Sequence, residues 1–355
     1  MPATPPVVIG GVDTHGRTHH AAVIDEVGRV LGSAEFDVTA PGYQRLLRWM
    51  RRHGEIASVG VEGTGTYGAG LCRALTAAGV KVIEVDRPDR RVRRQRGKSD
   101  PIDAEAAARS VLAGTATAIP KNRSGIVESI RALRVARSSA VKARTAAINA
   151  LKSLVVTAPD ELRATLEKLS TAELVHTCAR FRPAPAGLTD PGPGTKLAMR
   201  LLARRIEGFD NEIVEANKSI SPLVKKAAPR TMALLAIGPD HAGQFLVTAG
   251  DSPERLRSEA SFAHLCGSAP IPASSGATHR HRLHRGGDRA ANRALHLVVV
   301  VRMRYCARTR AYVERRTKDG LSKVEIMRCL KRYVAREIFH SLTADLRALH
   351  GLDNL

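Results

Sequence analysis

Short apolar runs and turn residues alternate over the first 85 residues, and this alternation constrains the fold more than any other feature of the chain. Three strands joined by tight turns are predicted first, at residues 7–13, 20–24 and 30–36. Helix and strand then alternate, with a helix at 41–53, a strand at 56–62, a helix at 67–78 and a strand at 80–85. Antiparallel strands followed by alternating helix and strand predict a mixed sheet with helices packed on its faces.

Four acidic residues stand where such a sheet would collect a ligand. Asp13 ends the run V-V-I-G-G-V, and Glu62 ends the run S-V-G-V. Asp100 and Asp103 lie three residues apart in G-K-S-D-P-I-D-A-E, so at a helix start their carboxylates face the same way. Each acid alone is typical of a cap or turn. Together they favour a site for a hard divalent cation such as Mg²⁺, which prefers carboxylate oxygens and leaves positions open for phosphates.

The charge balance predicts a polyanionic partner. The chain has 56 Lys and Arg against 34 Asp and Glu, a formal net charge of +22, which favours nucleic acid over a membrane surface. Aromatic residues make up only 3%, so contacts to phosphates are expected to outweigh base stacking. The segment 87–98 is either a solvated loop or a contact to the phosphate backbone, and its basic residues are Arg87, Arg90, Arg91, Arg93, Arg94, Arg96 and Lys98.

Other classes of protein are disfavoured. No apolar run approaches the ~18 residues of a spanning helix, and the N-terminus M-P-A-T-P-P does not have the pattern of a signal peptide, so we expect a cytoplasmic protein. The five cysteines are widely spaced without a C-x-x-C pair, which indicates neither a zinc site nor a disulfide framework.

The middle of the chain predicts two long amphipathic helices. Residues 126–158 and 196–226 have apolar stripes at helical spacing, and the proline- and glycine-rich segment 182–194 between them reads as a loop. This pattern is typical of an antiparallel hairpin or coiled coil, an arrangement that often forms dimers.

The last third predicts a mostly helical domain. Residues 231–246 read as helix, turn and helix, a shape that can present backbone amides to a phosphate. Further helices are expected at 288–307 and 322–349. Between these regions, a Ser-Ser-Gly turn at residues 274–276 is either an ordinary turn or part of a site. It precedes a dense set of cations, Arg280, Arg282, Arg285, Arg289 and Arg293.

Five motifs taken in order resemble the DEDD transposases of the insertion-sequence 110 family. They are G-V-D-T-H, V-E-G-T-G-T-Y, K-S-D-P-I-D-A, G-S-A-P-I-P-A-S-S-G and R-L-H-R-G-G-D-R-A-A-N-R-A-L. The resemblance implies a RuvC-like, ribonuclease H-like domain at 1–115, a helical coiled-coil linker at 116–228 and a transposase domain at 229–355. One departure is visible, because the family usually reads P-G-I-G or P-G-V-G before the second helix, where this chain has A-I-G-P-D-H-A at 236–242.

The resemblance also implies a chemistry. Mg²⁺ would be bound by Asp13, Glu62, Asp100 and Asp103. The serine of the family's P-x-x-x-x-S-G pattern corresponds to Ser275, with Ser274 as the alternative, and it would form a phosphoserine bond to DNA. Family members act as multimers, so a dimer or tetramer is implied, together with a structured guide RNA and the DNA of the element ends and target.

The sequence therefore predicts a DNA recombinase that moves its own insertion sequence. Two alternatives remain open. A Holliday-junction-resolving nuclease would use the same acids with water as nucleophile, and would form no covalent adduct. A non-catalytic nucleic-acid-binding protein would tolerate the loss of all four acids.

Overall fold

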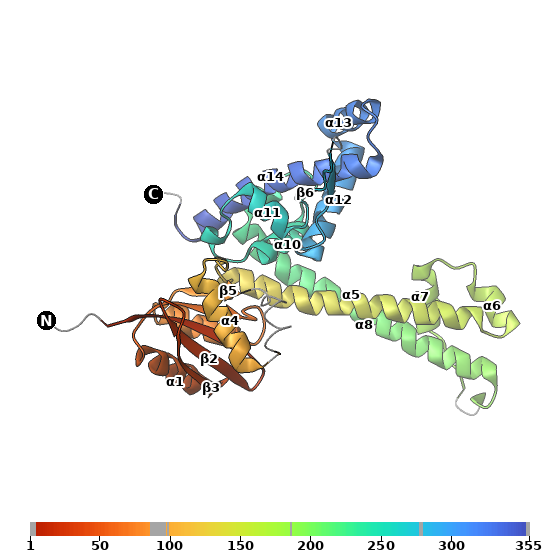
Figure 1. Cartoon of the computed structure of the whole chain (residues 1–355). Helices are drawn as coiled ribbons and strands as arrows, with labels where there is room; N and C mark the ends of the chain where they lie inside the picture. The colour runs from red at the N-terminus through yellow and green to blue at the C-terminus, as the bar shows by residue number, and fades with distance from the viewer. Residues whose placement is uncertain (1–4, 86–96, 98, 185–186, 277–279, 353–355) are drawn as a thin grey trace. The chain divides into compact units, whose positions relative to one another are not determined.

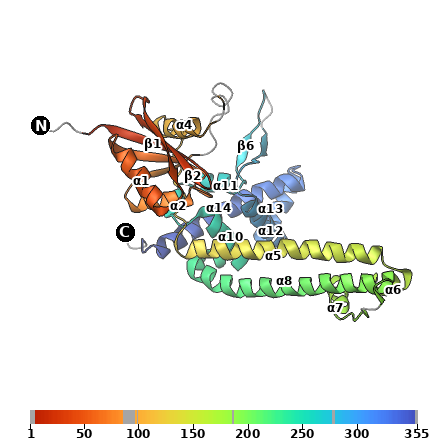
Figure 2. The same ribbon diagram turned by 90° about the horizontal axis from the view of Figure 1, so that it is seen from below.

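The computed structural model describes residues 5–85, 97, 99–184, 187–276 and 280–352. Its contacts divide the chain into two compact units, one made of Met1–Val127 and Thr248–Leu355 and the other of Glu128–Val247. Figures 1 and 2 give two views of the chain. The expected boundaries near residues 115 and 228 remain a prediction.

The N-terminal sheet is the mixed sheet that the sequence predicts. Its strand order is β3-β2-β1-β4-β5. The strands are β1 (Val7–Thr14), β2 (Thr18–Asp25), β3 (Val30–Asp37), β4 (Glu55–Glu62) and β5 (Val82–Val85). The first three pair antiparallel, whereas β4 runs parallel to β1 and β5 runs parallel to β4. The fold class of an α/β domain followed by helices is confirmed.

Helices cover both faces of this sheet (Figures 1 and 2). On one face α1 (Ala40–Arg51) and α2 (Ala69–Ala77) build a core with strand residues such as Val12 and Val59. The other face carries α4 (Asp100–Leu112), whose Ala108 packs against Ile9. This second face is the one that positions the candidate acids.

The second unit contains the two long helices, α5 (Gly125–Val156) and α8 (Pro191–Ala227), which lie side by side in Figure 2. Arg144 bonds Asp210 at 2.6 Å and Arg137 bonds Asn217 at 2.6 Å, so the helices run antiparallel. The predicted hairpin of helices is therefore present.

The connection between the long helices differs from the predicted loop. It contains α6 (Asp160–Leu166) and α7 (Thr171–Ala179), and α7 packs on α8 through a core that includes Leu174 and Met199. The predicted loop 182–194 is also too long, because α8 begins at Pro191. Proline fits a first helical turn, where its missing N–H is not needed. The last part of the proline-rich segment therefore forms the first turn of α8.

The predicted helix-turn-helix consists of α9 (Pro229–Met232) and α10 (Pro239–Ala249). In the turn, Ala236 has a φ of 69°, a left-handed conformation that costs a residue with a Cβ atom about 1–2 kcal/mol. Ala236 stands where the family pattern has its first glycine, so the departure in sequence places an unfavoured residue in a left-handed turn.

The C-terminal region is mostly helical, as predicted, but it holds more elements than the sequence indicated. The elements are η2 (Pro253–Arg255), α11 (Glu259–Leu265), β6 (Pro270–Pro272), β7 (His281–Leu283), α12 (Arg289–Tyr305), α13 (Ala307–Lys318) and α14 (Lys323–Leu349). Of these, α12 and α14 match the predicted helices, and Phe262, Leu295 and Ile338 are buried. The short hairpin β6–β7 carries the Ser-Ser-Gly segment.

The described structure can be compared with two expectations, one about membrane-spanning helices and one about the cysteines. Within the described ranges, no helix combines the length and the apolar character that crossing a membrane requires. All five cysteines are free thiols, and burial raises the pKa of Cys72 to about 12. Such a thiol stays protonated and packs as a small apolar side chain.

Candidate active site

Two of the candidate acids lie at the same end of two neighbouring strands. Val12 of β1 pairs with Val61 of β4 in the parallel register, so Asp13 and Glu62 follow at adjacent positions. Asp13 is buried and Glu62 is half-buried. Thr14 donates from Oγ1 to the Glu62 carbonyl at 2.8 Å, which ties the two strand ends together.

Helix α4 reaches these strand ends because two glycines let it cross the sheet closely. A Cβ atom on Gly11 would lie 2.1 Å from the carbonyl oxygen of Ala104, and one on Gly60 would lie 2.8 Å from that of Ala107. Real Cβ atoms essentially never approach other atoms below 3.0 Å, so only glycine permits this crossing. Each glycine stands two residues before a candidate acid and faces the same side of the sheet.

The other two candidate acids lie in the first turn of α4. Ser99 is the N-cap residue, and Pro101 occupies an early position that suits its fixed φ. The N–H of Asp103 donates to the Ser99 carbonyl at 3.0 Å, and Asp103 is only 2% exposed. Carboxylates in a first turn are also favoured by the helix dipole. The helix start is therefore compatible with two acids beside the sheet.

Three side chains from these elements come together. The Nε2 atom of His15 lies 3.1 Å from Oδ2 of Asp13 and 3.3 Å from Oδ1 of Asp100. One ligand atom from each of the three residues lies within 4.8 Å of the other two. This group does not include Glu62 or Asp103. The structure thus joins one predicted acid from the sheet with one from α4 through a histidine.

His15 is not among the site residues predicted from the sequence, although a signal was present. In D-T-H, His15 stands two residues after Asp13, at the edge of β1, and residues two apart face the same side of a strand. Its side chain and that of Asp100 are each about half exposed, so solvent and ligands can reach both. Two carboxylate oxygens and one imidazole nitrogen form a donor set that fits a divalent cation.

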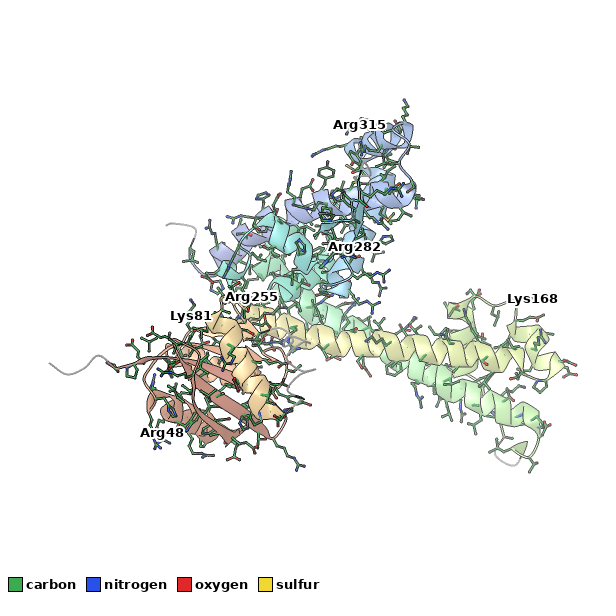
Figure 3. All side chains as sticks on the ribbon, in the orientation of Figure 1. Arg48, Lys81, Lys168, Arg255, Arg282 and Arg315 are labelled. Atoms are coloured by element: carbon green, nitrogen blue, oxygen red, sulfur yellow. The ribbon has the colours of Figure 1, made fainter. Side chains whose placement is uncertain are left out.

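The loop that follows Glu62 is held by a polar network. The hydroxyl of Thr64 donates to Oε1 of Glu84 on β5, and Oε2 of Glu84 lies 3.6 Å from Nη2 of Arg255. Arg255, labelled in Figure 3, also donates from Nε to the Ile119 carbonyl at 2.6 Å. The side chain of Arg255 is 12% exposed. An arginine from the C-terminal region, largely shielded from solvent, therefore helps to fix the loop beside a candidate acid.

The candidate nucleophile lies on the β6–β7 hairpin. Ser275 is exposed, and Gly276 follows with a φ of 55°. The neighbouring Ser274 makes long hydrogen bonds of 3.3 and 3.5 Å with the backbone N–H and carbonyl of Arg280. Ser274 is thus turned toward the partner strand.

The basic residues predicted to contact nucleic acid fall into two groups. The seven basic residues between 87 and 98 lie outside the described residues. The five arginines from Arg280 to Arg293 are all exposed, and Arg282 is labelled on the hairpin in Figure 3. Arg289 and Arg293 lie one turn apart on α12, so they share a helix face.

A sheet of this order, with carboxylates at the ends of β1 and β4 and a helix that carries further acids across the sheet, is typical of a ribonuclease H-like domain. Residues 10–158 match the family model for the DEDD type of IS110 element, described as Transposase. Residues 229–314 match the family described as Transposase IS116/IS110/IS902 family. The chain belongs to the IS110 family of transposases, enzymes that bind, cut and rejoin DNA. No curated protein matches it.

Proposed function

We propose that this transposase moves its insertion sequence by cutting and rejoining DNA at a Mg²⁺ site, through a covalent bond between Ser275 and a DNA strand. The observation that carries the acid site is the group of Asp13, His15 and Asp100, whose ligand atoms lie within 4.8 Å of one another. It occurs at the strand ends where ligands of open α/β sheets collect.

The four acids are proposed to hold the metal. Asp13 and Glu62 come from the strand ends, and Asp100 and Asp103 come from the first turn of α4. A bound Mg²⁺ would neutralise charge on the attacking and leaving oxygens of a phosphodiester. Without a cation, the carboxylates of Asp13 and Asp100, which have oxygens within 4.8 Å of each other, repel one another. The close crossing of α4 at the two glycines supports the approach of these two acids.

The serine chemistry exchanges one phosphoester bond for another. The Ser275 oxygen attacks the phosphorus and gives up its proton, while the bond from phosphorus to the leaving sugar oxygen breaks and that oxygen takes up a proton. A sugar hydroxyl later attacks the phosphoserine and releases the serine, so rejoining needs no ATP. Ser275 is favoured over Ser274 because the Ser274 hydroxyl is engaged with the backbone of Arg280.

The partners of the reaction are polyanions. DNA of the element ends and target, together with a structured guide RNA, would be bound through the basic segment 87–98 and the five exposed arginines between residues 280 and 293. Release of counterions makes such binding weaken as salt rises, by about 0.7–0.9 in the log–log slope per phosphate neutralised. The hairpin of long helices would support a dimer or tetramer. The proposed domains are residues 1–115, 116–228 and 229–355.

The proposal is tested by trapping reaction products of wild type, Ser275→Ala and Ser274→Ala on a denaturing gel. We expect a protein–DNA adduct in wild type and Ser274→Ala and none in Ser275→Ala, although all three bind DNA. If wild type cleaves without an adduct, water is the nucleophile and a Holliday-junction-resolving nuclease replaces the proposal. If wild type does not cleave DNA, and variants that lack the four acids bind DNA like wild type, the protein is a non-catalytic nucleic-acid-binding protein.

A further inference from the structure

A cleft of about 520 Å³ lies in the C-terminal region, between the β6–β7 hairpin, α13 and the first half of α14. Its lining is unusually cationic. Six basic side chains line it, namely Arg280, Arg282, Arg316, Arg328, Lys331 and Arg332. One carboxylate, that of Glu325, is present among the lining residues.

The acidic groups near the cleft leave much of this charge uncompensated. Glu325 accepts from the N–H and hydroxyl of Ser322 at 2.9 and 2.6 Å, and these hydrogen bonds, followed by the nearby charges of Arg280 and Arg328, lower its pKa. Arg316 pairs with Asp319 at 3.0 Å, and Arg332 pairs with Glu259 of α11 at 3.1 Å.

The three other arginines that line the cleft are Arg280 and Arg282 of the hairpin and Arg328 of α14. Within the described part of the chain, Arg280, Arg282 and Arg328 form no ion pair with a carboxylate. Burial, and then the charge of Arg328, lower the pKa of Lys331. A cleft lined by six basic side chains and one carboxylate concentrates an anionic ligand, and arginine binds phosphate with two parallel hydrogen bonds.

The cleft also has an apolar side. Leu321, Pro270 and the ring of Tyr333 line it, and Tyr333 is 47% exposed. Its ring meets Tyr312 edge-on with centroids 5.6 Å apart, which holds the ring in place. A phosphate beside a flat apolar body is the composition of a nucleotide, and the volume falls within the ~300–1,000 Å³ of small-ligand sites.

The position of the cleft connects it to the candidate nucleophile. Ala273 donates its N–H to the Arg280 carbonyl at 2.8 Å, so Arg280 stands opposite Ala273 in the hairpin. Ser275 follows two residues later, about 7 Å along an extended chain. A nucleotide in the cleft would therefore neighbour the phosphate that the serine attacks.

We propose that this cleft binds a single nucleotide of the DNA strand, displaced from base stacking and adjacent to the phosphodiester attacked by Ser275. Arg280, Arg282 and Arg328 bind its phosphate, and Tyr333 contacts its base. The assignment rests on the proposed function for the identity of the strand. The binding site itself is testable without any reaction.

The test is the anisotropy of a labelled single-stranded hexanucleotide bound to the full-length protein in metal-free buffer, compared with the same hexanucleotide carrying abasic sites. Because base–aromatic stacking contributes ~1–3 kcal/mol per base, Tyr333→Ala should weaken binding of the normal strand by roughly five- to 140-fold. The abasic strand should lose little. Tyr333→Phe keeps the ring and should bind like wild type, which separates loss of the contact from damage to α14.

A matched pair of arginines tests the phosphate contact. Arg328→Gln should reduce the salt slope by about 0.7, the value for one phosphate of a single strand. Arg315→Gln removes an exposed arginine of α13 that lies over the Tyr312 ring and does not line the cleft, and it should leave the slope unchanged. Equal effects of the two variants, or equal losses for normal and abasic strands in Tyr333→Ala, would overturn the site. Failure to form an adduct would refute the serine chemistry and leave these binding results intact.

Discussion

Gly11→Ala is the substitution that most directly separates the position of α4 from the chemistry of its acids. The new Cβ atom would lie 2.1 Å from the Ala104 carbonyl oxygen and 2.4 Å from the Ala108 nitrogen. Both are backbone atoms of α4, so no side chain can rotate away. Ordinary contact begins at 3.4 Å, so the helix must move by about 1.3 Å, the difference between 3.4 and 2.1 Å, to restore ordinary packing.

This displacement acts directly on the candidate site. Asp100 starts α4, and its Oδ1 atom is 3.3 Å from His15 Nε2, so a movement of this size breaks the contact. Misplacement by about 1 Å can reduce a rate roughly 100-fold, and overpacking costs about 1–3 kcal/mol of stability. We expect single-turnover DNA cleavage to fall by about two orders of magnitude, with a lowered melting temperature.

The matched control is the neighbouring residue on the opposite face. A Cβ atom on Gly10 would meet the Sδ and Cε atoms of Met50 at 2.9 Å, and this flexible end of a side chain can move. Gly10→Ala should lower the melting temperature and retain most of the cleavage rate. If Gly11→Ala, compared at equal folded fraction, cleaves within threefold of Gly10→Ala, then α4 does not position the acids as we argue.

Three further predictions address other parts of the structure. Asp13→Asn and Asp103→Asn should each abolish cleavage in Mg²⁺. Neither should lower the melting temperature in metal-free buffer, because loss of one carboxylate relieves repulsion. Full activity in both variants would refute a shared metal site. Arg255→Met and Glu84→Gln should couple by about 0.5–3 kcal/mol in a double-mutant cycle of unfolding free energies, because the two charged groups lie 3.6 Å apart and are partly shielded from solvent. Additive effects would contradict this pairing. Ala236→Gly should raise the free energy of unfolding by about 1 kcal/mol by relieving the left-handed conformation, and a loss of stability in chemical denaturation would argue against that strain.

The sheet could be predicted from the sequence because its strands carry local signals. Apolar runs bounded by turn residues mark all five strands, and strand ends alone placed Asp13 and Glu62 near each other. The close crossing of α4 was not predicted, because it depends on contacts between residues about 50 and 90 positions apart. The recurrence of glycine two residues before each acid, in G-V-D and G-V-E, was the available signal.

The structure also differs from the prediction where one residue type is compatible with two kinds of local structure. Proline and glycine in the segment 182–194 indicate a loop, but Pro191 also suits a first helical turn, and there α8 begins. The short helices α6 and α7 are stabilised by packing against α8, which local propensity does not encode. His15 was missed because a single histidine after an acid is common, and only the fold brings Asp100 to it.

The central claim is that the acids and Ser275 serve one reaction. Mass spectrometry of tryptic peptides from a nuclease-trimmed reaction in Mg²⁺ tests it most directly. The account predicts a nucleotide phosphate on the peptide containing Ser275 in wild type, and an unmodified peptide in Asp13→Asn protein that binds the same DNA. A modified Ser275 peptide in Asp13→Asn, or a wild-type protein that cleaves DNA while this peptide stays unmodified, would contradict it.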